Sequence, residues 1–414
     1  MRLFICSLLL VLTLAFPLSS IVKSAPPQTS DIEQYLINAR FKQGETALLA
    51  KLQQNPNSDR DRFGLGVIQL MGGTERLMQS LYNYGLQQNY FTAFFPILRL
   101  PVPVNPKPQQ ITYEESRTIL QNLLNDLDKV KTTLAPIKDN KVKLPLRIGL
   151  TRMDFNANGK LEANESFWKT FNQLTGQQAT EKTVQGFAIA FDAGDVVWLK
   201  GYCNLLSAIA QTVLAHDGSK LFNSTAHLIF AKPQIPYPFL ANGTGAFNWG
   251  GNIDISDIVA FIHLINLPVI EPQRMTAALQ HLQTVTALSR ESWKLILAET
   301  DNDREWLPNP KQKGVIPNAA VTQPMIDSWL SFLNETDALL TGKKLVPFWR
   351  KREIRGINLN KVFTKPQPFD LVLWVQGTAA APYLEPGVLT DAATWQRLMQ
   401  VFRGQFFQFA AWFN

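Results

Sequence analysis

The chain has 414 residues, of which 46% are hydrophobic and 18% are charged, and its formal charge is +7. This hydrophobic content is sufficient for a protein that stabilises itself through a buried core. Most lysines and arginines are mixed with acidic residues, and the short basic runs at 343–344 and 350–352 are typical of a solvated surface. We therefore expect no nucleic-acid partner.

The first 24 residues have the order of a secretory signal peptide. Arg2 precedes an apolar run from Leu3 to Leu18, and small residues follow before a predicted cleavage at Ala25. The alternative is an uncleaved membrane anchor, but the run is shorter than the roughly 20 residues that span a bilayer. Cleavage removes Arg2 and Lys23 and no acid, which lowers the formal charge from +7 to +5.

No later stretch is apolar enough to span a membrane. We therefore predict an exported protein, periplasmic or extracellular, with no transmembrane segment in the mature chain. Cys6 leaves with the signal peptide, so the mature chain contains Cys203 and no intrachain disulfide. Because Cys203 lies in the apolar stretch GYCNLLSAIA, we expect it to be a buried core residue rather than a nucleophile.

Helical periodicity dominates the rest of the sequence. A capping box is predicted at Thr112 and Glu115, and Asp59 or Asp61 is expected to cap an earlier helix. The predicted helices lie, in chain order, within 30–54, 63–86, 112–134, 195–215, 254–265, 272–299, 323–340 and 391–414. Short strands are expected at 228–230 and 368–376. These elements predict an all-α fold, a multi-helix globular body with at most a short β-hairpin.

A proline-rich segment interrupts the helical pattern. Five prolines lie between Pro96 and Pro108, and they exclude a continuous helix there. The predicted organisation is a signal peptide at 1–24, a helical hairpin region at 25–95, a linker at 96–110 and a main helical domain at 111–414.

The stretch DFNANGKLEANE, residues 154–165, has the ligand spacing of a calcium loop. Calcium prefers about six to eight oxygen ligands, and a twelve-residue loop supplies them from places 1, 3, 5, 7, 9 and 12. Gly159 at the sixth place permits the sharp turn. The predicted ligands are the side chains of Asp154, Asn156, Asn158, Glu162 and Glu165 and the carbonyl oxygen of Lys160.

At these residues the sequence resembles the EF-hand family. The resemblance implies a helix-loop-helix site, and an apolar spacing suited to the entering helix is found at Leu146, Gly149, Leu150 and Met153. Ser166 departs from the family pattern, because this place is usually apolar. EF-hands usually occur in pairs, and the sequence has no second complete loop; the acidic stretch ETDNDREW lacks the glycine and the final glutamate.

We therefore expect a static structural calcium ion rather than a sensor, since a sensor normally opens a groove in a paired domain. Two asparagines in place of aspartates lower the ligand charge, which indicates an affinity of about 10⁻⁴ to 10⁻³ M. The alternative is an asparagine-rich turn that binds no ion.

Signals of catalysis are weak. The sequence has no G-x-S-x-G, H-E-x-x-H or Walker motif. Two carboxylate pairs, Asp192 with Asp195 and Asp254 with Asp257, precede apolar helices and are predicted to cap them. The four histidines share no ligand spacing, and we expect His263 to be a core residue.

A second apolar stretch leaves an alternative open. Asp370 and Gln376 flank the apolar run near Trp374 and Tyr383, where a buried polar group would need a partner or a ligand. Core packing is the preferred interpretation, and a ligand pocket is the alternative.

The sequence therefore predicts an exported calcium-binding helical protein with a structural site and a binding or scaffold role. Its partner would be a protein or a small molecule, and no catalytic residue is assigned. Over its whole length the chain loosely resembles helical proteins of unassigned activity that bacteria export, which implies no activity. The alternative function is an exported hydrolase with a carboxylate-lined cleft.

Overall fold

The computed structural model describes residues 30–402 except 95–97, 99, 176–179, 186–187, 243–247, 251–252, 303, 315–320 and 351–352, together with 406 and 409–410. The predicted signal peptide and most of 403–414 lie outside the described residues. The α-helices are α2 (Asp31–Ile37), α3 (Phe41–Gln54), α4 (Asp59–Asn83), α5 (Tyr113–Leu134), α6 (Phe167–Thr175), α7 (Glu181–Gln185), α8 (Ala193–Leu214), α9 (Ser219–Thr225), α10 (Phe239–Asn242), α11 (Ile255–Leu264), α12 (Pro272–Ala298), α13 (Gln323–Leu340), α14 (Leu359–Thr364), α15 (Leu371–Gln376) and α16 (Ala392–Val401).

The prediction of a mainly helical body is confirmed. Short 3-10 helices are η2 (Thr92–Phe94), η4 (Ile148–Leu150), η5 (Ala226–Leu228) and η6 (Thr378–Tyr383). The strands are β1 (Leu144–Leu146), β2 (Ile189–Phe191), β3 (Asn248–Gly250), β4 (Ile253–Asp254), β5 (Asn266–Leu267), β6 (Val346–Pro347), β7 (Gly356–Ile357), β8 (Phe369–Asp370) and β9 (Leu384–Glu385). Among the described residues these strands form four small sheets, ordered β1-β2, β3-β4, β5-β8 and β6-β7-β9, rather than one hairpin.

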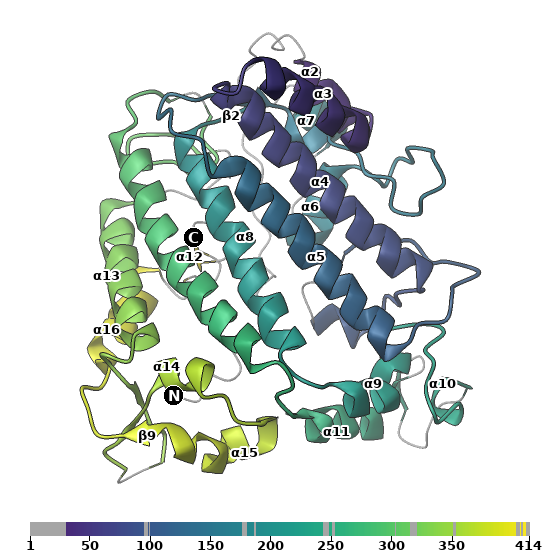
Figure 1. Cartoon of the computed structure of the whole chain (residues 1–414), viewed down its shortest axis with the longest axis vertical. Coiled ribbons are helices and arrows are strands. Elements are labelled where there is room, and N and C mark those ends of the chain that lie inside the picture. The colour runs from purple at the N-terminus through teal and green to yellow at the C-terminus, as the bar shows by residue number, and fades with distance from the viewer. Residues whose placement is uncertain are drawn as a thin grey trace.

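Four long helices, α4, α5, α8 and α12, lie side by side and form the body of the molecule, with α13 and α16 beyond α12 (Figure 1). The close contact of α8 with α12 follows from small residues. A Cβ atom at Gly194 would lie 2.9 Å from Ile296 Cγ1, and the Ser292 hydroxyl donates to the Gly194 carbonyl oxygen over 3.0 Å. Glycine at this position therefore lets the two backbones approach.

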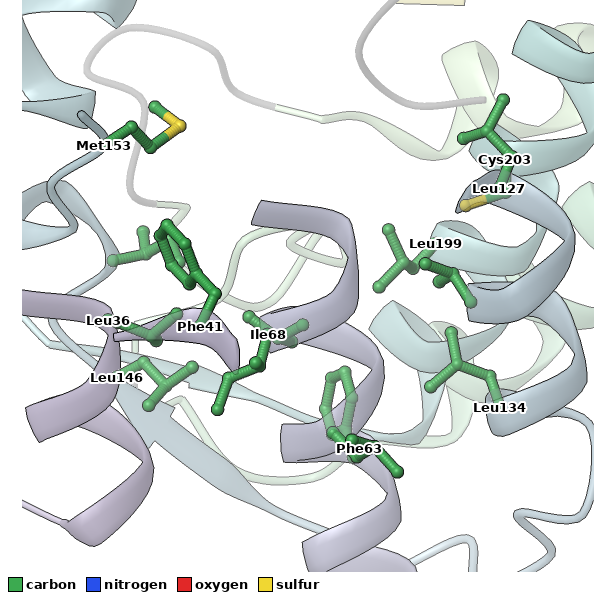
Figure 2. Close-up of a cluster of buried hydrophobic side chains, with 14 of the residues drawn as sticks. Leu36, Phe41, Phe63, Ile68, Leu127, Leu134, Leu146, Met153, Leu199 and Cys203 are labelled. Atoms are coloured by element: carbon green, nitrogen blue, oxygen red, sulfur yellow. The ribbon is translucent and has the colours of Figure 1, made fainter. Parts of the chain in front are cut away.

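The largest hydrophobic cluster joins α2, α3, α4, α5 and α8 to the segment after α5. Figure 2 shows part of it, including Phe63, Leu146, Met153 and Cys203. Met153 directly precedes the predicted calcium loop and is 1% exposed, so the start of this loop is held in the main core. Cys203 is also buried, as predicted, and burial raises the pKa of its thiol to about 12.

Several local predictions are confirmed. Thr112 and Glu115 form the predicted capping box of α5, and the predicted range 323–340 coincides with α13. The helix after residue 58 is capped by Ser58, whose side chain accepts the Asp61 backbone N–H, rather than by Asp59 or Asp61.

The two predicted strands are largely wrong. Residues 226–228 form η5, and Phe230 makes an isolated bridge with Leu86. The strand predicted at 368–376 is limited to β8, and the rest is α15. Asp370 caps this helix by accepting the Leu373 N–H over 2.8 Å, and Gly377 ends it with φ 111°. None of the described helices is long and apolar enough to cross a membrane.

Candidate metal site

The segment that enters the predicted calcium loop is not an α-helix, contrary to the expectation from the EF-hand resemblance. Residues Leu144–Leu146 form β1 and pair antiparallel with β2, and η4 follows. Pro145 lies in this strand, where it has no N–H to give to a helix and its ring disfavours a helical residue before it. The apolar residues of the segment still face inward, since Leu146 is fully buried.

The exit from the loop is helical, as expected, and begins with α6. Entrance and exit are joined by an antiparallel bridge between Arg152 and Ser166. The Met153 N–H donates to the Glu165 carbonyl oxygen over 2.9 Å, and the Phe167 N–H donates to that of Thr151 over 2.7 Å. Ser166, the residue that departs from the family pattern, is therefore a buried member of this bridge.

The first half of the loop is folded around the oxygen atoms of its predicted ligands. The Asp154 carboxylate accepts the backbone N–H groups of Asn158 and Gly159, over 3.1 and 2.8 Å. Asn156 Oδ1 accepts the same Asn158 N–H over 3.0 Å, and Asn158 Oδ1 accepts the Lys160 N–H over 2.7 Å. Because they share one donor, the oxygens at places 1 and 3 lie close together.

Gly159 has φ 74°, in the left-handed region, and a Cβ atom built there would meet nothing within 4 Å. The requirement for glycine at the sixth place is therefore conformational and does not come from crowding.

The second half of the loop contributes two carboxylates. Glu165 is fully buried, and its Oε1 and Oε2 atoms accept the backbone N–H groups of Phe155 over 2.9 Å and Glu162 over 2.7 Å. The Glu162 carboxylate accepts the side-chain amides of Asn158 over 3.0 Å and Asn156 over 3.5 Å. The side chains of Asn156, Asn158 and Glu162, at places 3, 5 and 9, thus lie together. Glu165, at place 12, connects the backbone of the first half of the loop to that of the second half.

A fourth carboxylate comes from α4, and no local pattern in the sequence predicts it. Glu75 Oε2 accepts the Asp154 backbone N–H over 2.7 Å. One turn later, Gln79 Nε2 donates to the Asp154 carbonyl oxygen over 2.8 Å. Both polar groups of the Asp154 backbone are therefore bound by one face of α4, which anchors the first place of the loop.

The electrostatics of the site favour a cation. Burial raises the pKa of Glu165, and the carboxylates of Glu162 and Asp154 raise it further. Burial also raises the pKa of Glu75 to about 7, and the negative charges of Asp154 and Glu165 add to this shift, against the opposing charge of Arg76. Several carboxylates that repel one another in a partly buried loop are stabilised by a bound divalent ion.

The chemistry of the predicted ligands suits calcium. Five of them are hard oxygen donors that the loop gathers around one turn, and the sixth is the carbonyl oxygen of Lys160, the residue whose N–H binds Asn158. Glu75 extends the acidic environment without being part of the twelve-residue pattern.

A second carboxylate cluster lies between the N-terminus of α8 and the segment after α12. One oxygen each of Asp192, Glu299 and Glu305 lies within 4.8 Å of the others. Burial raises the pKa of Glu299 to about 9, and the charge of Asp192 adds to the shift. Asp192 and Glu299 hydrogen-bond to each other through their side chains, so one of the pair holds a proton.

Both predicted capping pairs are confirmed. Asp192 with Asp195, and Asp254 with Asp257, form the capping boxes of α8 and α11. The convergence of Asp192 with Glu299 was not predicted, because it depends on the packing of α8 against α12.

The geometry expected of a hydrolase cleft is not found at the described pocket between α13 and α16. This pocket is lined by Asp327, Ser328, Ser331, Thr394, Arg397 and Leu398. It thus contains a single carboxylate, whereas Asp192, Glu299 and Glu305 converge elsewhere, at the N-terminus of α8.

Core packing, the preferred interpretation of the stretch near Asp370 and Gln376, is wrong, because α15 contains no buried residue. Asp370 caps α15, and Gln376 Oε1 accepts the Thr378 N–H over 2.9 Å, so both polar side chains have local partners.

No protein-family model matches the chain, and comparisons with curated proteins and with solved structures found no match.

Proposed function

We propose that this chain is an exported calcium-binding helical protein, in which the loop 154–165 holds a structural ion and the helical body has a binding or scaffold role. The observation that carries the proposal is the position of Glu165. This carboxylate is fully buried, it binds backbone N–H groups on both sides of the loop, and it lies beside the carboxylates of Asp154 and Glu162. A buried acid with acidic neighbours is best stabilised by a cation.

In this proposal the ligands are the side chains of Asp154, Asn156, Asn158, Glu162 and Glu165 and the carbonyl oxygen of Lys160. The ion supplies positive charge that offsets the repulsion among the carboxylates. The chain orients the oxygens: backbone N–H groups fix the Asp154 carboxylate, and the left-handed Gly159 turns the loop back toward it.

A structural rather than a regulatory ion is supported by the anchoring of the loop. Asp154 is bound to α4 through Glu75 and Gln79, and Met153 is buried in the main core. Opening of a sensor requires a helix pair that changes its angle. Here a strand and a 3-10 turn, rather than an entering helix, precede the loop.

Calcium binding is tested by titration calorimetry and by thermal unfolding, in calcium and in chelator. The wild type should bind calcium with a dissociation constant of about 10⁻⁴ to 10⁻³ M and melt at a higher temperature in calcium. Asp154→Asn should remove most of this difference. The control Glu291→Gln changes an exposed acid of α12 and should leave the difference intact. Equal melting temperatures for the wild type in both buffers, with no heat of binding, would show that the loop is an ordinary turn that binds no ion.

Export rests on the order of charged, apolar and small residues in 1–24. N-terminal sequencing of the protein from an expressing bacterium should find a chain that starts near Ala25 in the soluble extracytoplasmic fraction. Recovery of Met1 from a membrane pellet would contradict export.

A further inference from the structure

Two of the most apolar helices of the protein lie on its surface. Neither α11 nor α15, all of whose residues are described, contains a buried residue. The prediction that His263 is a core residue is therefore wrong, because the whole of α11 is accessible and His263 is exposed. Exposed apolar side chains that gather in one area of a protein surface usually mark an interaction site.

The exposed residues of these helices form what we call the apolar patch, which consists of Ile255, Val259, Ile262, Val372, Leu373 and Val375. Their exposed fractions range from 44% to 61%. On α11 they recur at intervals of four and three residues, so they form one stripe along the helix. The sequence LVLWVQ of α15 has no charged residue.

The two helices form one surface. Strands β5 and β8, which pair antiparallel, connect the end of α11 to the start of α15. The Leu371 N–H donates to the Ile265 carbonyl oxygen over 2.9 Å, and Asn266 Nδ2 donates to Asp370 over 2.9 Å. Figure 1 shows α11 and α15 next to each other along the lower edge of the molecule, and the two helices are in contact. The exposed apolar residues of both helices therefore lie on neighbouring elements of the surface.

The segment of the chain that contains α15 is rich in basic residues. Residues 341–389, which include α14 and α15, contain eight lysines and arginines and three acids, a formal charge of +5. This equals the formal charge of the whole chain from Ala25 onward. Arg350 donates through Nε to the Gln376 carbonyl oxygen over 2.8 Å at the end of α15, and Lys365 is exposed at the end of α14.

Aromatic residues border the same helix. Trp349 Nε1 donates to the Val375 carbonyl oxygen over 3.2 Å. Trp374 stacks on Tyr383 with a ring separation of 5.9 Å. Apolar side chains flanked by tryptophan and by basic residues are the composition of protein surfaces that lie in the interface of a lipid bilayer.

We propose that the apolar patch docks on an anionic lipid bilayer, with Val372, Leu373 and Val375 inserted among the lipids and with Arg350 and Lys365 facing the headgroups. The charge decides between this surface and a second copy of the chain. A symmetric dimer through the patch would place two segments of charge +5 against each other, whereas anionic headgroups attract both. This inference names the partner for the proposed binding role and does not depend on the calcium loop.

The test is flotation of the exported protein with vesicles of phosphatidylcholine alone or mixed with phosphatidylglycerol, in chelator so that calcium cannot bridge protein and lipid. The protein should float with the anionic vesicles, and high salt should weaken the binding. Val372→Ser/Leu373→Ser/Val375→Ser should weaken it by about tenfold or more, because three apolar side chains no longer leave water.

A second variant, Ile255→Ser/Val259→Ser/Ile262→Ser, tests the other half of the patch and should weaken binding in the same way. The matched control removes exposed apolar side chains elsewhere, at Leu49, Val104 and Leu297, by the changes Leu49→Ser/Val104→Ser/Leu297→Ser. This control should float like the wild type.

Calcium affinity is measured on the same proteins, and the patch variants should bind calcium as the wild type does. A failure of the docking proposal can therefore be distinguished from a failure of the calcium site. Equal flotation of wild type and both patch variants would overturn the docking proposal, as would equal binding to neutral vesicles. A wild-type dimer that the patch variants abolish, without vesicle binding, would assign the patch to a second copy. Vesicle binding that requires residues 1–24 would also contradict docking through the apolar patch.

Discussion

Glu75 on α4 accepts the backbone N–H of Asp154, the first predicted calcium ligand, over 2.7 Å. The contact links two residues that are far apart in sequence, and it places a carboxylate outside the twelve-residue pattern next to the loop. Because Gln79 binds the carbonyl oxygen of the same residue, α4 fixes the orientation of the peptide at which the loop begins. In the proposed site, calcium binding and the packing of α4 are therefore linked.

Substitution of Glu75 tests this link. Glu75→Ala leaves the Asp154 N–H without its acceptor and should lower the free energy of unfolding by about 1 kcal/mol. It should also weaken calcium binding a few-fold, because the first ligand is less well oriented. Glu75→Gln retains an oxygen acceptor and should restore most of both losses. Chemical denaturation and calorimetry measure the two effects; equal losses in the alanine and glutamine variants would show that charge, rather than the hydrogen bond, is what matters.

The carboxylate cluster of Asp192, Glu299 and Glu305 predicts a pH dependence of stability. The pKa of Glu299 is about 9 in the folded protein against an ordinary value of 4.5, so the folded state holds this proton more tightly than the unfolded state. The stabilisation is fully present below pH 4.5 and is lost as the pH rises toward 9. Glu299→Gln should therefore flatten the fall in stability over this range.

Denaturation measured at several pH values in chelator tests the prediction, and Glu291→Gln on α12, the helix that Glu299 follows, is the matched control. A wild-type stability that falls no more steeply with pH than that of Glu299→Gln would contradict the raised pKa.

The buried thiol gives a third prediction. Cys203 is fully buried and its pKa is raised to about 12, so almost no thiolate is present at neutral pH. A thiol reagent should label the native protein far more slowly than the protein unfolded in denaturant. Mass spectrometry of the time course measures both rates, and rapid labelling of the native chain would show that Cys203 is accessible.

Most of the confirmed predictions depend on signals between residues that are close in the sequence. The capping box at Thr112 and Glu115 and the range of α13 depend on residues that are neighbours along the chain. The strand predicted at 368–376 failed although local signals were present. The β-branched apolar run favours a strand, but Asp370 caps a helix there and Gly377 ends it in a left-handed conformation.

Other features depend on contacts between distant segments. β1 forms by pairing with β2, which lies in a later segment of the chain. The local apolar spacing before the loop does not reveal this partner and predicts a helix instead. The twelve-residue pattern predicted which oxygens gather around the turn, but Glu75 reaches them from α4. In the same way, Asp192 and Glu299 meet through the packing of α8 against α12, and no spacing in the sequence predicts that contact.

The two glutamates of the loop should differ in their importance for calcium. Glu165 is fully buried and both of its oxygens are oriented by backbone N–H groups, whereas Glu162 is partly exposed and receives the side-chain amides of Asn156 and Asn158. A twelfth-place glutamate binds calcium through two oxygens, and the ninth place often binds through water. Glu165→Gln should therefore weaken calcium binding more than Glu162→Gln.

An ion that binds only the folded state adds RT ln(1 + [Ca]/Kd) to stability, about 1.4 kcal/mol at ten times Kd. At one calcium concentration, the difference in melting temperature between calcium and chelator should decrease from wild type to Glu162→Gln and nearly vanish in Glu165→Gln. Because Glu165 also binds backbone groups, its variant should be less stable in chelator too, so the difference between the two buffers is the quantity compared. A larger loss for Glu162→Gln would reverse the assignment and make the ninth place the main anionic ligand.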